Sequence, residues 1–350
     1  MPPLNRHIRP IDRAVPRREV LLGGLGLAAA LLAGCSSSGG GNSPTVPLTV
    51  GGSRTGAGPF PVTVAGKEGS VTLRSAPKRV VAVGYLRDAD LALALGAPLA
   101  GAARNSVFAS GLAPWQKPTT SPELFDTADG LPFEQIAALR PDLILATDDY
   151  TLAKDYANLA KIAPTLSYLQ GVGADSWPSI TTRAGQVLGT PAQAASLIAA
   201  TQAKVASAKQ QNSVLAGKTF TFGPVSSLDS IYTINDVTDA SSKFFAQLGM
   251  SLSPKVTSLP QSSTPRRAKI SLEQLSILDA DVVILSYPDP TVRSKLESQA
   301  VFQELAAVKR GSYIALDMAA AVAVAFPSAL SIPYGLDATV PRLVAAARKA

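Results

Sequence analysis

Short apolar runs alternate with helix-like stretches through most of the chain that follows about residue 62. Residues 79–83 (RVVAV) predict a strand, and residues 89–95 predict the helix after it, with Gly96 at its end. Residues 143–146 and 282–285 are uninterrupted apolar runs, which are typical of buried strands. Strands that alternate with helices indicate a mainly parallel αβ sheet.

The most informative pattern is a repeat at a separation of 139 residues, in which FEQIAALRPDLILA (133–146) matches LEQLSILDADVVIL (272–285). The two copies carry the same residue at four positions, which pair Glu134 with Glu273, Gln135 with Gln274, Leu139 with Leu278 and Asp142 with Asp281. Both copies predict a short helix that opens with Glu, then a turn and a buried strand. A period this long excludes a solenoid and indicates two similar lobes.

One long helical stretch lies between the two copies. Residues 191–210 (PAQAASLIAATQAKVASAKQ) contain no internal proline or glycine, Pro191 suits the first turn and Thr190 suits the N-cap. Such a helix spans about 30 Å. We therefore expect an α/β fold of two Rossmann-like lobes, residues 62–190 and 218–350, with a central cleft and a bridging helix over residues 191–213.

The first 34 residues are organised like an export signal. A basic segment, residues 1–19, precedes an uncharged run of 14 residues, 20–33, which is shorter than the about 20 residues that a spanning helix needs. Residues 16–22 (PRREVLL) resemble a twin-arginine export signal, an address read by a receptor. Residues 32–35 (LAGC) resemble a bacterial lipobox, which implies that Cys35 is lipidated. An ordinary cleaved signal or a weak membrane anchor is the alternative.

A flexible tether is predicted for the segment that follows Cys35. Sixteen of the 26 residues in 36–61 are Gly, Ser or Pro, and Arg54 carries the only charge. Such a segment buries too little apolar surface to offset its ordering entropy. We therefore expect a signal peptide over 1–34, a lipidated cysteine and tether over 35–61, and a domain that works at the outer face of the cytoplasmic membrane.

Charge and residue usage exclude several functions. The formal charge is +7, but five Arg and two acidic residues lie in 1–34, which leaves 27 basic and 23 acidic residues, or +4. This mild, evenly spread excess gives no indication of nucleic-acid binding. The single His is His7 and the single Cys is Cys35, so residues 36–350 contain neither. That composition excludes disulfides, zinc sites and histidine-based triads there.

From about Phe60 to the C-terminus, seven segments occur in an order that resembles the helical-backbone (class III) solute-binding proteins of ABC importers. They are APKRVVAVG (76–84), DADLALALG (88–96), residues 133–146, LAKIAPT (159–165), AGQVLG (184–189), ISLEQ (270–274) and LAAVKRG (305–311). The family serves ferric siderophores, haem and vitamin B12. The resemblance implies two αβ lobes with a bridging helix. It also implies a monomer that carries a ferric siderophore to the permease subunits of an ABC importer.

Candidate ligand contacts follow the predicted strands, because ligands of open αβ sheets bind beyond the carboxyl ends of strands. They are Tyr85, Arg87, Trp115, Tyr150, Arg267, Tyr287 and Phe326. Core packing is an equal alternative for Trp115, and an exposed loop side chain is the alternative for Tyr150. Solvated surface is the alternative for Tyr85, Arg87 and Arg267, and Trp177 is assigned to the core. Tyr150 falls where ferric-hydroxamate binders place a ligand-contacting Tyr. Those proteins carry an Arg where this chain has Ala128, so the siderophore class stays open.

Glu134 and Glu273 have two readings. A carboxylate in the first turn of a helix is stabilised by the helix dipole, which is a purely structural role. In the resembled family the corresponding residues dock onto arginines of the importer's membrane subunits, so we expect both glutamates to be docking residues.

Other functions remain as alternatives to siderophore binding. Haem binding would use a Tyr such as Tyr85, Tyr150 or Tyr287 as axial ligand, and a corrinoid would need no protein ligand. A hydrolase would depend on carboxylates such as Asp148 and Asp149, but adjacent side chains on an extended segment diverge. We expect no enzyme activity, no resident metal and no cofactor.

Overall fold

The structure, a computed structural model, describes residues 60–350. The predicted signal segment, Cys35 and almost all of the predicted tether lie outside this range. Within residues 60–350, no helix is long and apolar enough to cross a membrane.

The first lobe is built on five parallel strands in the order β5-β4-β3-β6-β7. A separate antiparallel pair, β1 with β2, precedes this sheet. The elements are β1 (Val62–Val64), β2 (Val71–Leu73), β3 (Val80–Ala82), α1 (Arg87–Ala94), β4 (Leu99–Ala103), β5 (Glu123–Phe125), α2 (Phe133–Ala138), β6 (Leu143–Ala146), α3 (Leu152–Ile162), β7 (Thr165–Ser167) and α4 (Trp177–Val187).

The second lobe has a mixed sheet in the order β11-β9-β8-β12-β13, with β10 also paired to β8. Strand β9 is antiparallel to β8 because a two-residue hairpin connects them, and the other pairs around β8 are parallel. The elements are β8 (Thr219–Ser227), β9 (Ser230–Ile234), α6 (Ala240–Gln247), β10 (Ser251–Leu252), α7 (Pro254–Thr257), β11 (Arg267–Ile270), the 3₁₀ helix η2 (Leu272–Leu278), β12 (Val282–Ser286), α8 (Pro290–Glu297), α9 (Ala300–Gln303), α10 (Ala306–Arg310), β13 (Tyr313–Leu316), α11 (Met318–Ala325) and α12 (Ser331–Ala347).

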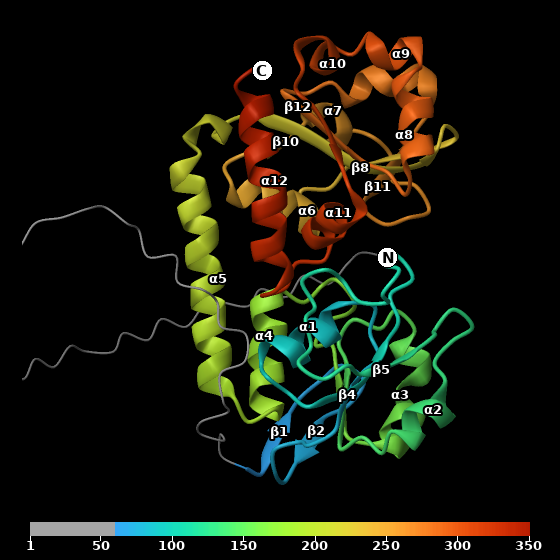
Figure 1. Ribbon diagram of the computed structural model, residues 1–350, viewed down its shortest axis with the longest axis vertical. Coiled ribbons are helices and arrows are strands. Elements are labelled where there is room, and N and C mark those ends of the chain that lie inside the picture. Colours follow the sequence, from blue (N-terminus) through green and yellow to red (C-terminus); the bar gives the residue numbers. More distant parts are fainter. Residues whose placement is uncertain (1–59) are drawn as a thin grey trace, which may run out of the picture. The chain divides into compact units, whose positions relative to one another are not determined.

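A single long helix, α5 (Pro191–Gln211), connects the lobes and is followed by the 3₁₀ turn η1 (Ser213–Leu215). It packs against α4 of the first lobe and α12 of the second, as Figure 1 shows. Thr190 occupies the N-cap position as expected, but its hydroxyl group makes no capping hydrogen bond. The α/β fold of two lobes and a bridging helix confirms the fold predicted from the sequence.

The apolar strand runs are explained by cores on both faces of the first sheet. Val80 and Leu143 pack into one cluster with α1 and α4, whereas Val81 and Ile144 pack into another with α2 and α3. A parallel strand covered on both faces needs apolar residues at every position, which is why these segments do not alternate with polar residues.

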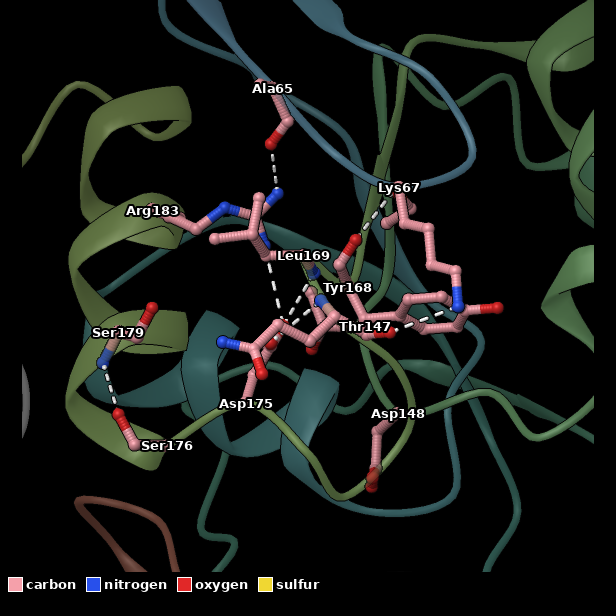
Figure 2. A network of polar contacts seen from close by, with 12 residues as sticks. Ala65, Lys67, Thr147, Asp148, Tyr168, Leu169, Asp175, Ser176, Ser179 and Arg183 are labelled. Atoms are coloured by element: carbon pink, nitrogen blue, oxygen red, sulfur yellow. Dashed lines mark hydrogen bonds and ion pairs between the residues drawn. The ribbon is translucent and has the colours of Figure 1, made fainter. Parts of the chain in front are cut away.

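A polar network fastens the β1–β2 hairpin to the segment after β7 (Figure 2). The guanidinium group of Arg183, on α4, donates to the carbonyl oxygen of Ala65, and its Nη1 lies 3.9 Å from Asp175 Oδ2. Asp175 in turn accepts from the backbone N–H groups of Leu169 (2.5 Å) and Gln170 (2.9 Å). The network holds one edge of the first lobe in place.

The repeat of the sequence corresponds to a repeated fastening in the structure. Asp142, just before β6, accepts hydrogen bonds from the backbone N–H groups of Lys78 (2.7 Å) and Arg79 (2.8 Å) at the start of β3. Its counterpart Asp281, just before β12, accepts from the N–H (2.7 Å) and hydroxyl (2.8 Å) of Thr219 at the start of β8. Each aspartate therefore joins the beginnings of two central strands.

Replacement of either aspartate by alanine is expected to lower the free energy of unfolding by about 1–3 kcal/mol, because two hydrogen-bond donors lose their acceptor. Urea unfolding of Asp142→Ala and Asp281→Ala measures this loss. Asp229→Ala, in the exposed β8–β9 turn, is the control and should stay within about 0.5 kcal/mol of the wild type. A loss in only one lobe would contradict the equivalence of the two fastenings.

Candidate functional site

Buried carboxylates organise the loops after β3 and β6. Asp148 is fully buried, and its Oδ1 accepts from Arg87 Nε (2.9 Å) and Nη2 (2.6 Å). Its Oδ2 accepts from the backbone N–H groups of Leu86 and Arg87, both at 3.0 Å. Arg87, a predicted ligand contact, is itself only 6% exposed. Its guanidinium group is therefore committed to holding these two loops together.

Asp88 fixes the same two loops from the other side. Its carboxylate accepts from Gly84 N (3.1 Å), Thr147 N (3.0 Å) and Thr147 Oγ1 (2.5 Å). A Cβ atom at position 84 would lie 2.3 Å from Asp88 Oδ2, so only glycine fits there. Burial and the nearby Asp148 carboxylate raise the pKa of Asp88 to about 7.

Asp90 joins the two lobes. Its carboxylate accepts from Trp115 Nε1 (3.1 Å) and Gln116 Nε2 (2.7 Å) in the first lobe and from Ser328 Oγ (2.5 Å) in the second. The hydroxyl oxygen of Ser328 also accepts from the N–H of Ser331 (2.9 Å) at the start of α12. Burial raises the pKa of Asp90 to about 7, although the three donated hydrogen bonds oppose the shift.

Aromatic side chains from both lobes pack beside this junction. The rings of Tyr85 and Phe326 have centroids 4.9 Å apart, and those of Trp115 and Tyr334 are 5.0 Å apart. Trp115 is buried and shares one apolar cluster with Val322 of α11. The predicted contacts Tyr85, Trp115 and Phe326 are therefore brought together at the boundary between the lobes.

A pocket of about 250 Å³ opens at the carboxyl ends of the first-lobe strands. Its lining residues are Val83, Tyr85, Ala103, Arg104, Thr127, Ala128, Gly130, Leu131, Asp148, Asp149, Tyr150 and Thr151. Tyr150 is 67% exposed. Although most of the side chain is in contact with solvent, partial desolvation by the surrounding protein and the Asp148 carboxylate raise the pKa of Tyr150 to about 12, so its hydroxyl group stays a hydrogen-bond donor at neutral pH.

Arg267, from the second lobe, is not among the residues that line this pocket. Its positive charge lowers the pKa of the Tyr150 hydroxyl group in part, as does the charge of Arg87. Arg267 Nη1 is paired with Asp239 Oδ2 at 2.7 Å, and the side chain remains partly exposed. Its neighbour Arg266 has a positive φ of 59°, a conformation uncommon outside glycine.

Tyr287 lies apart from the pocket, in the core of the second lobe. It is 5% exposed, and its hydroxyl group is 2.7 Å from that of Tyr313, which also hydrogen-bonds to Glu297. Burial raises the pKa of Tyr287. These contacts place Tyr287 in a network that secures α8 to the ends of β12 and β13.

Three functional positions were missed by sequence reasoning. Arg104 lines the pocket directly after β4, and within residues 60–350 its guanidinium group has no hydrogen-bond or ion-pair partner. Arg104 could have been predicted as a pocket residue, because it follows the carboxyl end of β4 as Tyr85 follows β3 and Tyr150 follows β6. Asp90 and Ser328 are 238 residues apart and gave no sequence signal for their contact.

Glu134 and Glu273 occupy equivalent places in the two lobes. Each is exposed and is the second residue of a short helix that leads to the strand beside the central one, β6 or β12. Backbone and Ser271 hydrogen bonds lower the pKa of Glu273, so it is anionic at neutral pH. Both glutamates lie in the first turn of a helix, where the helix dipole stabilises a negative charge. Both are also exposed, so a partner protein can reach them.

The described part of the chain contains no group of three or more His, Cys, Asp or Glu side chains arranged to hold a metal ion. The pocket lining includes the carboxylates of Asp148, which is paired with Arg87, and Asp149; beside them it offers hydroxyl groups and the guanidinium group of Arg104. These groups bind oxygen-rich or anionic ligands rather than bare cations.

Two αβ lobes joined by one helix, with a pocket at the strand ends beside their boundary, define a class III solute-binding protein of the kind that serves ABC importers. A profile of the periplasmic binding protein family matches residues 81–320. The chain belongs to this family.

Individual relatives agree with this assignment. The ferric enterobactin-binding periplasmic protein FepB of Escherichia coli is 34% identical over 164 residues, or 44% of this chain and 51% of FepB. The match thus spans about half the length of FepB. A periplasmic solute binding protein from Mycobacterium smegmatis is 28% identical, with a TM-score of 0.71 over 82% of this chain and 98% of that one. The iron uptake ABC transporter substrate-binding protein PiaA from Streptococcus pneumoniae is 25% identical, with a TM-score of 0.67 over 83% and 100%.

The raised pKa values of Asp88 and Asp90 predict how stability depends on pH. Both lie near 7 in the folded protein, above about 3.9 in an unfolded chain. The folded state therefore binds protons that the unfolded chain releases, and the resulting stability is full below pH 4 and is lost as pH rises through 7.

Asp90→Asn removes one of these two titrating groups. We expect its free energy of unfolding to fall less steeply between pH 5 and 8 than that of the wild type, with a difference of up to about 1.4 kcal/mol per pH unit. Urea unfolding at four pH values checks this, and Asp229→Asn, which changes an exposed turn, should keep the wild-type slope. Equal slopes for Asp90→Asn and the wild type would contradict the assignment.

Proposed function

We propose that this chain is an extracytoplasmic lipoprotein that binds a ferric-siderophore complex and delivers it to an ABC importer. The observation that carries the proposal is the open pocket that Tyr85, Arg104 and Tyr150 line together. Their hydroxyl and guanidinium groups suit the oxygen-rich surface of an iron chelate. The siderophore itself supplies every iron ligand, which fits a sequence without His or Cys in residues 36–350.

The relatives support iron as the cargo. FepB is named for binding ferric enterobactin, and PiaA is described as the substrate-binding protein of an iron uptake ABC transporter. A ferric tris-catecholate carries a net negative charge. Arg104 lines the pocket, and the positive charge of Arg267, from the second lobe, acts on the pocket residue Tyr150. An anionic ferric complex is therefore the ligand best matched to these charges.

The candidate residues take different roles in this proposal. Tyr85, Arg104 and Tyr150 contact the ligand from the first lobe. Arg267 and Phe326 contact it from the second lobe. Three further predicted residues act indirectly: Arg87 positions the loops through Asp148, Trp115 supports the wall behind Tyr85, and Tyr287 supports the second lobe.

A fluorescence titration tests the proposed ligand. The two tryptophans are Trp115, beside the pocket wall, and Trp177. The protein is titrated with ferric catecholate, hydroxamate, carboxylate and citrate complexes. At least one of them is expected to quench the tryptophan fluorescence. Haem, which would show a sharp Soret band, and cobalamin are included. No response to any member would refute the proposed ligand class and leave the fold unaffected.

Arg104→Gln is expected to weaken binding of an anionic ferric complex by at least tenfold, because a charge-assisted hydrogen bond of about 1.5–3 kcal/mol is lost. Arg74→Gln makes the same charge change at an exposed residue before β3 and should bind like the wild type. If both variants lose affinity equally, the effect is one of overall charge, and Arg104 has no place in the site.

We also propose that Glu134 and Glu273 dock the loaded protein onto cationic residues of the importer. Charge reversal of both, Glu134→Arg with Glu273→Arg, is expected to reduce iron uptake by cells more than tenfold while leaving ligand affinity within twofold. Uptake of radioactive ferric complex and the fluorescence titration separate these effects. Glu304→Arg, at the exposed end of α9, is the control for surface charge. Unchanged uptake in the double variant would exclude docking through these residues.

Lipidation of Cys35 completes the proposal. The residues around it match a lipobox, and export through the twin-arginine route is proposed from residues 16–22. Cys35→Ser is expected to release the protein from the membrane fraction into the soluble extracytoplasmic fraction, as followed by immunoblotting. Retention of Cys35→Ser on the membrane would indicate an uncleaved anchor instead.

A further inference from the structure

A second, larger groove lies in the connection between β4 and β5. Its volume is about 720 Å³, within the range of small-molecule sites. Its lining residues are Val107, Phe108, Ala109, Ser110, Leu112, Ala113, Pro114, Gln116, Pro118, Ser121, Pro122 and Leu124. None of these residues is charged. The groove is thus chemically distinct from the neighbouring pocket that contains Arg104 and Tyr150.

Hydrogen bonds fix the shape of this groove. Asn105 Nδ2 donates to the carbonyl oxygen of Tyr85 (3.2 Å), and Asn105 Oδ1 accepts from Val107 N (3.1 Å). Gln116 Oε1 accepts from Ala113 N (2.8 Å), while its Nε2 donates to Asp90. The connection is therefore anchored to the same buried carboxylate that joins the lobes, and its apolar surface is built into the fold.

Gly111 lies between a residue of the pocket and a residue of the groove. Gly111 has a φ of 79°, and a Cβ atom there would lie 2.8 Å from both Arg104 Nη1 and Leu124 Cδ1. Arg104 lines the pocket, and Leu124 lines the groove. One ligand can therefore touch both, with its polar part at Arg104 and an apolar part across Gly111.

We propose that the groove binds an apolar appendage of the ligand, so that the protein favours amphiphilic ferric chelates, in which an iron-chelating head carries a hydrocarbon chain. This inference rests on the proposed function, because it places the chelate in the pocket at Arg104. The exposed side chain of Val107, at 37%, leaves apolar surface that such a chain would remove from water. Each fully buried methylene is worth about fourfold in affinity.

Matched ligands test the proposal. We would measure affinities for the ferric complexes of N-acetyl and N-octanoyl desferrioxamine B. A second pair is the ferric complexes of bis(2,3-dihydroxybenzoyl)lysine as its methylamide and its octylamide. Within each pair the chelating head is the same, so only the chain length changes. For a head that binds, we expect the long-chain member to bind at least tenfold more tightly to the wild type.

Two double variants locate the effect. Val107→Glu with Ala109→Glu places charge in the groove and should abolish the gain from the long chain while the short-chain affinity stays within twofold. Ala199→Glu with Ala200→Glu makes a similar charge change on the exposed face of α5 and should keep the gain. Equal affinities for both chain lengths, or a gain that persists in the groove variant, would overturn the proposal and leave the groove to a protein partner.

An iron-free measurement separates this inference from the proposed function. The neutral dye N-phenyl-1-naphthylamine should fluoresce with the wild type and with the α5 variant, but not with the groove variant. If neither chelating head binds yet the dye shows this pattern, the proposed ligand fails for these heads while the apolar site is supported. If the dye gives the same signal with all three proteins, or with none, the apolar site is refuted.

Discussion

Burial of three carboxylates, Asp88, Asp90 and Asp148, is the constraint on which the rest of the site depends. Each is at most 1% exposed, and removing a carboxylate from water is expensive unless donors and opposite charge surround it. Those donors come from the loops after β3 and β6, from the β4–β5 connection and from the second lobe. None of these segments can shift without leaving a buried acceptor unsatisfied. The walls of both cavities are therefore fixed before any ligand arrives.

The two lobes reach a similar architecture with partly different means. In each, an aspartate before the second strand of the central pair, Asp142 or Asp281, secures the start of the neighbouring strand. The carbonyl oxygen of Leu139 accepts from Arg79 Nε, and that of its repeat partner Leu278 accepts from Thr221 Oγ1. The hairpin between β8 and β9 makes only the second sheet mixed. The two lobes thus fix the same backbone positions, although partly different side chains make the hydrogen bonds.

Patterns that depend on local chemistry could be predicted from the sequence. Residues 143–146 form a strand with the predicted bounds, and the long helix begins at Pro191 as expected, because apolar runs and helix-start signals are local. The site was predicted less completely. Strand ends indicated the loops but not which side chains would find partners there: Arg87 is paired with Asp148, whereas Arg104, one strand away, lines the pocket and has no side-chain partner within residues 60–350. Such outcomes depend on contacts between distant segments, which periodicity does not encode.

The position of residues 326–334 has a consequence for biogenesis. Phe326, Ser328 and Tyr334 pack against Tyr85, Asp90 and Trp115 of the first lobe, and the contact of Ser328 with Asp90 joins residues that are 238 positions apart. During synthesis the first lobe emerges from the ribosome with this apolar and acidic surface uncovered, although domains commonly fold in the order in which they are made. Its last layer arrives only after residues 326–334 have been made. Maturation of the first lobe is therefore tied to synthesis of the second, and a chain truncated before α12 would leave both lobes incomplete.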